Sequence, residues 1–311
     1  MEPTRSVQNG EVTLAVYTWG RPGTKAKPKP TIVLVHGYPD SAGVWKGTAE
    51  LLAKRYYVIA YDVRGAGRSS RPKAISAYAM PKLVEDLTAV LDEMSPDQPV
   101  HLVGHDWGSI QSWESVTSPE LRDRIASYTT ISGPCLDHAA HWIRTRVRSG
   151  SMQSLGEVAR QLAHSWYIVM FQLPVLGPAA WRLGLDKRWP TILRKTEGIE
   201  DAEPSETQRE DGAFGVNLYR ANFINKLLKP EQRHTDIPVQ LIQPLRDNFM
   251  VREIWDDLSQ WTSKLWRREV DAGHWLPVSQ PDLVAEYISD FVDFVENGEA
   301  SESLRLAQVG T

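Results

Sequence analysis

The chain has 311 residues, of which 41% are hydrophobic and 24% charged, with a net charge of −4 and a pI near 6.1. These values are typical of globular proteins, so they predict a sizeable core and argue against nucleic acid as the main partner, because nucleic-acid-binding domains are usually basic. The single cysteine, Cys135, excludes a disulfide within the chain and is consistent with a reducing, cytoplasmic environment.

No segment has the pattern of a targeting or membrane-spanning sequence. Met1–Gly10 lacks a basic stretch followed by an apolar one, so no signal peptide is predicted. The longest apolar region, residues 166–185, is interrupted by Pro174, Pro178 and Arg182. Because a bilayer-spanning helix needs a longer uninterrupted apolar run, we expect no stable membrane insertion.

Strand-like and helix-like segments alternate over the first 134 residues. Residues 11–19 alternate in polarity, which predicts a strand, and a polar loop is expected at 21–30. The β-branched run at 31–36 is typical of a strand buried on both faces. Further strands are predicted at 57–62, 100–104 and 125–132, and helices at 44–54, 80–94 and 109–116. This alternation indicates an α/β fold with a mostly parallel sheet.

The alternation stops between Cys135 and His234, where only helical pieces rich in Trp, Leu and Arg occur. It resumes with strands at 239–243 and 266–270 and helices near 251–261 and 281–295. We interpret the middle region as a helical cap inserted into an α/β core. The predicted organisation is a core of residues 1–134 and 235–297, a cap of residues 135–234 and a flexible, polar tail of residues 298–311.

The sequence VGHDWGS, residues 103–109, lies where a buried strand must turn directly into a helix. Gly104 and Gly108 flank Asp106 as in a nucleophile elbow, where larger side chains would clash in the tight turn. Serine usually occupies the central position, so Asp106 is the candidate nucleophile. The alternative is that Asp106 only caps the following helix.

Two further residues complete a candidate catalytic triad. His274, in DAGHW, follows the last strand, and Asp247, in LRDN, follows the strand before it. Both therefore lie at the carboxyl ends of strands, at the same edge of the sheet as the elbow. The order nucleophile, acid, histidine matches the α/β-hydrolase triad. Asp256 and Asp257 fall inside the next predicted helix, and Asp271 is too close to His274 in the chain.

The sequence HGYP, residues 36–39, directly follows the strand at 31–36. A backbone N–H from this loop, together with the N–H of the residue after the nucleophile, would form an oxyanion hole. Tyr38 and Trp107 are the residues predicted to supply these groups. By itself HGYP is a weak signal, because such turns are common after strands.

A carboxylate nucleophile restricts the reaction. Attack on an sp³ carbon leaves an ester, which a histidine-activated water can hydrolyse, whereas a serine would leave an ether. Asp106 therefore indicates an alkyl electrophile, either an epoxide or a carbon–halogen bond, and not the substrates of esterases, lipases or peptidases. An epoxide requires proton donors opposite Asp106, while a halide requires only weak N–H donors.

The HGYP loop and the segment Gly104–Gly108 resemble the paired signatures of α/β-hydrolase-fold epoxide hydrolases, and the likeness extends over about residues 11–295. That family places two cap tyrosines over the nucleophile, one shortly before a Phe-Gln pair and one in an Asn-x-Tyr-Arg context. The resemblance implies that Tyr167 and Tyr219 bind the epoxide oxygen while Asp106 opens the ring. It also implies that His274, oriented by Asp247, hydrolyses the ester to give a vicinal diol, with no cofactor or metal.

The resemblance has departures, and two other functions stay open. The acid loop, QPLRD, lacks the glycine-containing turn that hydrolases more often carry. In a haloalkane dehalogenase, Trp107 would fit as a halide donor, but Tyr38 stands where those enzymes usually have Asn. A non-catalytic, ligand-binding hydrolase fold would be favoured if His274 or Asp247 lay too far from Asp106. The sequence SGP at 132–134, followed by His138 and His141, resembles actinobacterial epoxide hydrolases, which are sometimes fused to a reductase-like second domain.

Apolar residues near the proposed catalytic groups predict the substrate contacts. Of the twelve tryptophans, Trp166 and Trp275, like Trp107, lie beside these groups in the sequence, and the other nine need serve only packing. The residues expected to bind a small apolar epoxide are Trp166, Phe171, Trp275 and Pro39. A homodimer is compatible with the sequence.

Overall fold

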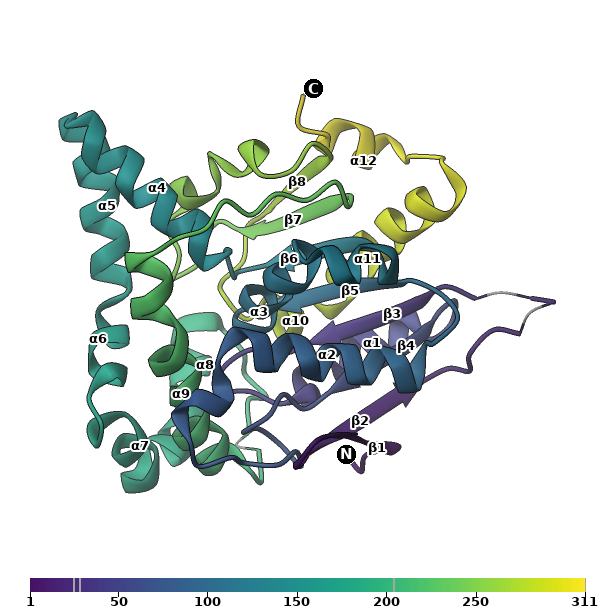
Figure 1. Cartoon of the computed structure of the whole chain (residues 1–311), viewed down its shortest axis with the longest axis horizontal. Helices are drawn as coiled ribbons and strands as arrows, with labels where there is room; N and C mark the ends of the chain where they lie inside the picture. Colours follow the sequence, from purple (N-terminus) through teal and green to yellow (C-terminus); the bar gives the residue numbers. More distant parts are fainter. Residues whose placement is uncertain (25, 28, 204, 311) are drawn as a thin grey trace.

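Eight strands form one sheet in the computed structural model, which describes residues 1–24, 26–27, 29–203 and 205–310. The strands are β1 (Arg5–Asn9), β2 (Val12–Trp19), β3 (Thr31–Val35), β4 (Tyr57–Tyr61), β5 (Val100–His105), β6 (Ile125–Ile131), β7 (Val239–Pro244) and β8 (Leu265–Val270). Their order is β1-β2-β4-β3-β5-β6-β7-β8 (Figure 1). Only β1 and β2 run antiparallel to their neighbours, so the predicted mostly parallel sheet is confirmed.

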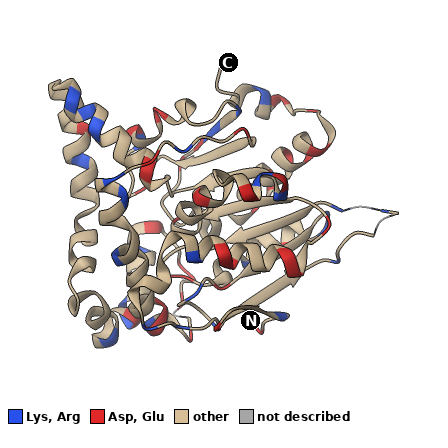
Figure 2. Cartoon of the chain, viewed as in Figure 1, with Lys and Arg blue, Asp and Glu red and all other residues tan. Residues whose placement is uncertain are grey.

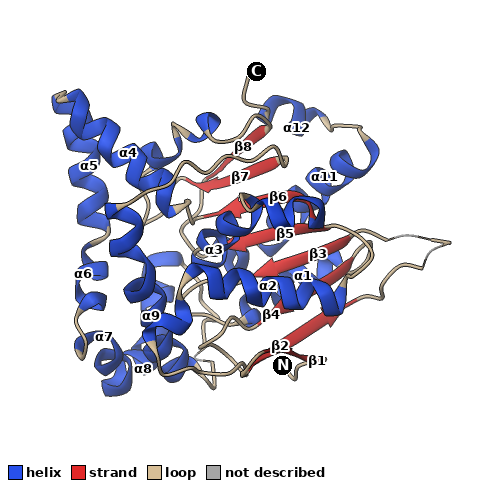
Figure 3. Cartoon of the chain, viewed as in Figure 1, coloured by secondary structure: helices blue, strands red, loops and turns tan. Residues whose placement is uncertain are grey.

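Helices cover both faces of this sheet (Figure 3). They are α1 (Lys46–Leu52), α2 (Met80–Met94), α3 (Trp107–Val116), α4 (Leu136–Ser149), α5 (Met152–His164), α6 (Trp166–Gln172), α7 (Leu176–Ala180), α8 (Asp186–Glu197), α9 (Gln208–Leu228), α10 (Leu276–Ser279), α11 (Pro281–Asn297) and α12 (Glu302–Ala307). Short 3₁₀ or π-helical turns lie at Ala42–Trp45, Ile75–Tyr78, Pro119–Arg124, Trp181–Leu185, Arg252–Trp255 and Leu258–Gln260.

The strand β3 shows how the core is divided between the two faces. Ile32 and Leu34 belong to the cluster that contains α1 and α11, whereas Val33 and Val35 belong to the cluster that contains α2 and α3. All four side chains are fully buried. A run of apolar residues without polar alternation is therefore required here, because both faces of the strand are covered.

Helices α4 to α9 lie between β6 and β7 in the chain and stand together beside the sheet (Figure 1). We propose that residues 135–234 form the cap, as expected from the sequence. None of the helices in the described ranges is by itself long and apolar enough to cross a membrane. The pair Trp166–Gln172 and Leu176–Glu197 meets the length and composition criteria only when combined across a bend of 104°.

Two buried acids and two partly buried cations form a charged network at the base of the cap. Asp137 of α4 is fully buried and bonds Lys226 Nζ of α9 and Arg233 Nε, both at 2.8 Å. Glu114 of α3 pairs with the same two cations, at 2.6 and 2.9 Å. Because buried charges are tolerated only when paired, this neutral network ties the two ends of the cap to the core.

The segments after β7 depart from the sequence predictions in two places. The helix expected near residues 251–261 is replaced by two short 3₁₀ turns. The tail expected to be flexible instead contains α12, where Ser301 caps the helix and Leu304 packs fully buried in the cluster of Trp266 and Phe291. Leu304 supplies the apolar contact that a loose tail would lack. Of the predicted segments, Lys25 and Pro28 of the loop, Pro204 of the cap and Thr311 of the tail lie outside the described residues.

Candidate active site

Asp106 lies in the turn between β5 and α3 with φ 51° and ψ −123°, a conformation that residues other than glycine rarely adopt. A Cβ atom on Gly104 would lie 2.6 Å from the Gly108 carbonyl oxygen, and one on Gly108 would lie 2.0 Å from the Val35 carbonyl oxygen. Both positions therefore require glycine, and the turn has the geometry of a nucleophile elbow. The Asp106 side chain makes no capping hydrogen bond to α3, so helix capping does not account for this aspartate.

His274 lies between two carboxylates. Its Nε2 atom is 3.4 Å from Asp106 Oδ2, and its Nδ1 atom is 2.9 Å from Asp247 Oδ2 and 3.0 Å from Oδ1. Asp247 is fixed in turn by the backbone N–H of Phe249 at 2.8 Å. All three members of the predicted triad are buried, so these distances join the groups that the sequence order suggested.

The QPLRD loop places Asp247 without a glycine turn because it continues the sheet. The Leu245 N–H donates to the Val270 carbonyl at 2.8 Å, and the Arg246 N–H donates to the Ala272 carbonyl at 2.9 Å. The chain thus stays hydrogen-bonded beyond β7 until it reaches Asp247.

His105 holds the backbone of His274. Burial lowers the pKa of His105 to about 4, so its imidazole is neutral, and its Nε2–H donates to the His274 carbonyl at 2.9 Å.

The two carboxylates control the protonation of His274. Burial alone would lower the pKa of this imidazole, but the charge of Asp247 and the hydrogen bonds to Asp106 and Asp247 raise it to about 10. Burial would raise the pKa of Asp247, but the charge of His274 and the hydrogen bonds from His274 and the Phe249 N–H together hold it below its ordinary value. At neutral pH the free protein therefore holds an imidazolium between two carboxylates.

We expect His274 to stay protonated through neutral pH and to lose protons more readily in an Asp106→Asn variant, which removes one of the two negative charges. Because the folded-state pKa lies above the ordinary value of 6.5, its contribution to stability is complete below pH 6.5 and is lost as the pH rises through about 10. Histidine NMR titration measures this pKa, with His274→Gln identifying the resonance. An ordinary pKa in the wild type, or an unchanged pKa in Asp106→Asn, contradicts this expectation.

The HGYP loop contacts the nucleophile directly. The Tyr38 N–H donates to Asp106 Oδ1 at 2.7 Å. A Cβ atom on Gly37 would lie 2.4 Å from Asp106 Cβ, so only glycine permits this approach. Trp107 is the first residue of α3, where backbone N–H groups have no acceptor within the helix. The Tyr38 N–H therefore contacts the nucleophile, while the joint role of the Tyr38 and Trp107 N–H groups as an oxyanion hole stays a prediction.

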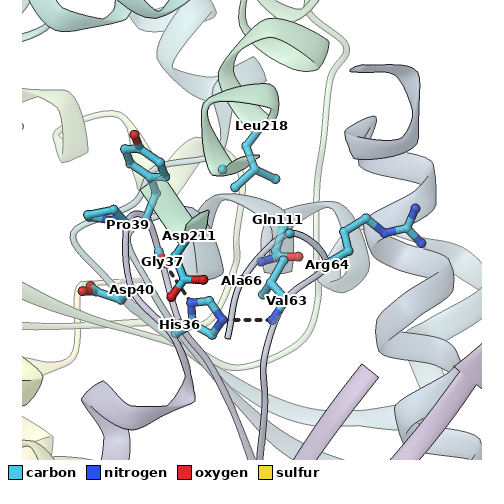
Figure 4. Close-up of a pocket in the computed structure, with 13 residues that line it drawn as sticks. His36, Gly37, Pro39, Asp40, Val63, Arg64, Ala66, Gln111, Asp211 and Leu218 are labelled. Atoms are coloured by element: carbon cyan, nitrogen blue, oxygen red, sulfur yellow. Dashed lines mark hydrogen bonds between the residues drawn. The ribbon is translucent and has the colours of Figure 1, made fainter. Parts of the chain in front are cut away.

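His36 links the HGYP loop to the segment after β4 (Figure 4). The Val63 N–H donates to its Nε2 atom at 2.9 Å, so its proton resides on Nδ1, which donates to the Gly37 carbonyl at 2.8 Å. Burial lowers the pKa of His36, which keeps this neutral tautomer. The cavity shown in Figure 4, lined by His36, Gln111 and Asp211 among others, measures about 10 Å³ and is too small for a substrate.

A much larger cavity of about 610 Å³ lies between the triad and the cap. Tyr167 of α6 and Tyr219 of α9 both line it, with ring centroids 6.0 Å apart. Burial, together with the negative charge of Asp106, raises the pKa of both phenols well above the ordinary value. Both tyrosines are therefore hydrogen-bond donors at any physiological pH.

The structure brings the sequence-predicted residues together. Nine of the eleven line this cavity, and the other two, Trp107 and Asp247, adjoin Asp106 and His274. The nine are Tyr38, Pro39, Asp106, Trp166, Tyr167, Phe171, Tyr219, His274 and Trp275. Phe171 and Trp275 are buried, whereas Trp166 is 66% exposed and lies at the edge of the cavity.

Several cavity residues were not predicted. Trp181 and Trp189, assigned to packing, line the cavity, as does Phe249 two residues after Asp247. Trp181 Nε1 also donates to the Tyr38 hydroxyl. No local pattern distinguishes these side chains, because the path of the cap brings them to the site. Within the described residues, no group of three His, Cys, Asp or Glu side chains is arranged to hold a metal ion.

Comparisons with known proteins agree with this fold. Residues 30–154 match a family model described as alpha/beta hydrolase fold. The structure resembles that of a Bacillus megaterium epoxide hydrolase in complex with an inhibitor, with a TM-score of 0.76 at 20% identity over 93% of this chain and 100% of the other. It also resembles epoxide hydrolase VrEH1 from Vigna radiata, with a TM-score of 0.74 at 20% identity over 93% and 97% of the two chains.

Two curated relatives come from Mycobacterium tuberculosis (strain ATCC 25618 / H37Rv). The probable oxidoreductase EphD is 37% identical over 308 residues, covering 96% of this chain and 51% of the relative. Epoxide hydrolase A is 39% identical over 177 residues, covering 56% of this chain and 49% of the relative. The chain thus matches about half the length of each of these relatives.

Proposed function

We propose that this chain, an α/β hydrolase related to epoxide hydrolases, converts an apolar epoxide to a vicinal diol through an ester on Asp106. One arrangement carries the proposal. The Asp106 carboxylate shares a largely apolar cavity with His274 and with two protonated tyrosines of the cap, Tyr167 and Tyr219. A halide leaving group would need no such proton donors.

In the first step Tyr167 and Tyr219 donate hydrogen bonds to the ring oxygen, and Asp106 attacks a ring carbon from the opposite side. A bond forms between this carbon and a carboxylate oxygen, the carbon–oxygen bond of the ring breaks, and its electrons pass to the ring oxygen. This oxygen takes the proton of a tyrosine. An alkoxide is more basic than an ordinary phenolate, which favours this transfer.

Ester formation prepares His274 for the second step. Esterified Asp106 carries no negative charge, so one of the groups that raised the pKa of His274 is lost and the imidazolium releases its proton. That proton returns to the tyrosinate. His274 is then neutral, and Asp247 still orients its Nδ1–H, which leaves Nε2 free to act as a general base.

Water then attacks the ester carbonyl while His274 takes one of its protons. The Tyr38 N–H, which already binds Asp106 Oδ1, stabilises the developing oxyanion together with the Trp107 N–H. The intermediate collapses, the alkoxide leaves with the second proton of the water molecule, and the Asp106 carboxylate is restored beside an imidazolium. Overall, one epoxide and one water give one diol.

We further propose a small apolar epoxide as the substrate, because the cavity of about 610 Å³ is lined mainly by aromatic and aliphatic side chains. The cytoplasmic location and the homodimer stay predictions from the sequence.

A single turnover in water labelled with ¹⁸O tests this proposal. With excess protein over styrene oxide, we expect the first diol to be unlabelled, because both of its oxygens come from the epoxide and Asp106. The label then appears in the peptide that contains Asp106. Mass spectrometry of diol and peptide measures both, with Asp106→Ala as the inactive control. A labelled diol in the first turnover would contradict the ester, and hydrolysis of a short haloalkane alone would favour the dehalogenase.

A further inference from the structure

Helices α5, α6 and α7 lie along the outer edge of the cap (Figure 1), and we call the exposed apolar side chains of these helices and of the turn after α7 the apolar strip. Six large apolar side chains of this strip are between 54% and 86% exposed. They are Leu162, Trp166, Val169, Val175, Leu176 and Leu183. Monomeric globular proteins rarely expose apolar side chains in such a concentration without a partner.

The charged side chains next to this strip are mainly basic, although Glu157 and Glu197 flank residues 158–196 in the sequence. Residues 165–181 contain no charged side chain at all. Residues 158–196 contain six basic residues and one acidic residue, in a chain whose net charge is −4. The acid, Asp186, is buried and pairs with Arg209. All six basic residues are exposed, namely Arg160, Arg182, Lys187, Arg188, Arg194 and Lys195.

Five of these six cations form no ion pair with any described residue, while Arg160 pairs with Glu253 at 2.6 Å. In Figure 2 the outer edge of the cap is accordingly tan along α6, with blue segments above and below it. An apolar stripe framed by Lys and Arg is the pattern of a helix that lies in the interface of a membrane with anionic lipids.

The strip is continuous with the wall of the active-site cavity. Trp166 is exposed and also lines the cavity, and its neighbours Ala163 and Met170 line it as well. A surface that contacts lipid here would place this wall of the cavity against the bilayer. An apolar substrate dissolved in the membrane would then lie close to the site.

We propose that this strip binds the surface of a membrane that contains anionic lipid, with α6 in the interface. A second copy of the chain is a poorer partner. In a symmetric dimer the same surface contacts itself, which would bring the cations of the two copies together. Anionic headgroups instead complement these cations, and the acyl region covers the apolar side chains.

Sedimentation with vesicles tests the proposal. We expect the chain to bind vesicles of phosphatidylcholine and phosphatidylglycerol, and to bind them more weakly at high salt or on phosphatidylcholine alone. The double variant Val169→Ser, Leu183→Ser removes two apolar contacts outside the cavity and should weaken binding by about tenfold or more. Leu306→Ser is the matched control, since Leu306 is similarly exposed on α12.

Weaker binding in the double variant, with unchanged binding in Leu306→Ser, supports the proposal. Absence of binding by the wild type, or equal loss in both variants, overturns it. A dimer in light scattering that the double variant dissociates, without vesicle binding, also overturns it and identifies the strip as a contact between copies. Circular dichroism checks that the variants fold. Vesicle binding is measured without substrate, so its outcome does not depend on whether the chain opens epoxides.

Discussion

Replacing His274 by glutamine lowers turnover of an epoxide by at least about a thousandfold, because the variant has no base to activate water. Ring opening by Asp106 needs no base and continues in this variant. We therefore expect the ester on Asp106 to form and persist. Intact-mass measurement after incubation with styrene oxide should show one substrate added per chain, and peptide mapping should place it on Asp106.

Two controls define this experiment. Adding Asp106→Ala to His274→Gln should abolish the adduct. His141→Gln should turn over normally, because His141 contacts the Glu231 carbonyl and the Trp261 ring and does not line the cavity. An adduct with a short haloalkane but none with an epoxide would show that the Asp106 site breaks carbon–halogen bonds. No adduct with either electrophile would contradict an Asp106 nucleophile.

Removing the two cap hydroxyls, by Tyr167→Phe and Tyr219→Phe, slows ring opening. One lost donor to a developing oxyanion typically costs 10²–10³-fold in rate, so we expect about a hundredfold for each single variant. The double variant should lose more rate than either single variant. The two losses should not multiply, because both hydroxyls bind the same oxygen. The rate of ester formation in a His274→Gln background measures this step in isolation.

The phenylalanine replacements leave the shape of the cavity in place. The Tyr219 ring stacks on Phe223 with centroids 5.5 Å apart and contacts Trp107 edge-on at 4.9 Å, contacts that a phenyl ring keeps. A short haloalkane is the control electrophile, because a halide leaves without taking a proton. Attack of Asp106 on the carbon of a haloalkane should therefore not depend on the two hydroxyls. Full epoxide activity in the double variant would remove Tyr167 and Tyr219 from the mechanism.

The elbow and the triad could be predicted from the sequence because the motif and the order of the strands carry the information. Gly104 is required by the backbone of Gly108 and Ser109 within the motif, whereas Gly108 is required by the Val35 carbonyl of the adjacent strand. His274 and Asp247 follow strands of a parallel sheet, whose carboxyl ends lie along one edge. Sequence order was then enough to predict which side chains meet.

Other features could not be predicted, because distant parts of the chain determine them. β1 lies at the edge of the sheet and pairs only with β2, and its five residues have little apolar pattern of their own. Leu304 becomes a core residue only because Trp266 and Phe291 are adjacent to it in the fold. Trp181 resembles any other tryptophan of the cap until the structure places its indole N–H on the Tyr38 hydroxyl.

Tyr38 connects the nucleophile directly to the cap. Its backbone N–H holds the Asp106 carboxylate at 2.7 Å, while its hydroxyl donates to the Gly212 carbonyl of α9 at 3.0 Å and accepts from Trp181. Any motion that lifts α9 away from the sheet must break these hydroxyl bonds or drag the loop that carries the N–H. We therefore expect a displacement of α9 to disturb the Tyr38 N–H that would stabilise the oxyanion, which would link the position of the cap to the rate of ester hydrolysis.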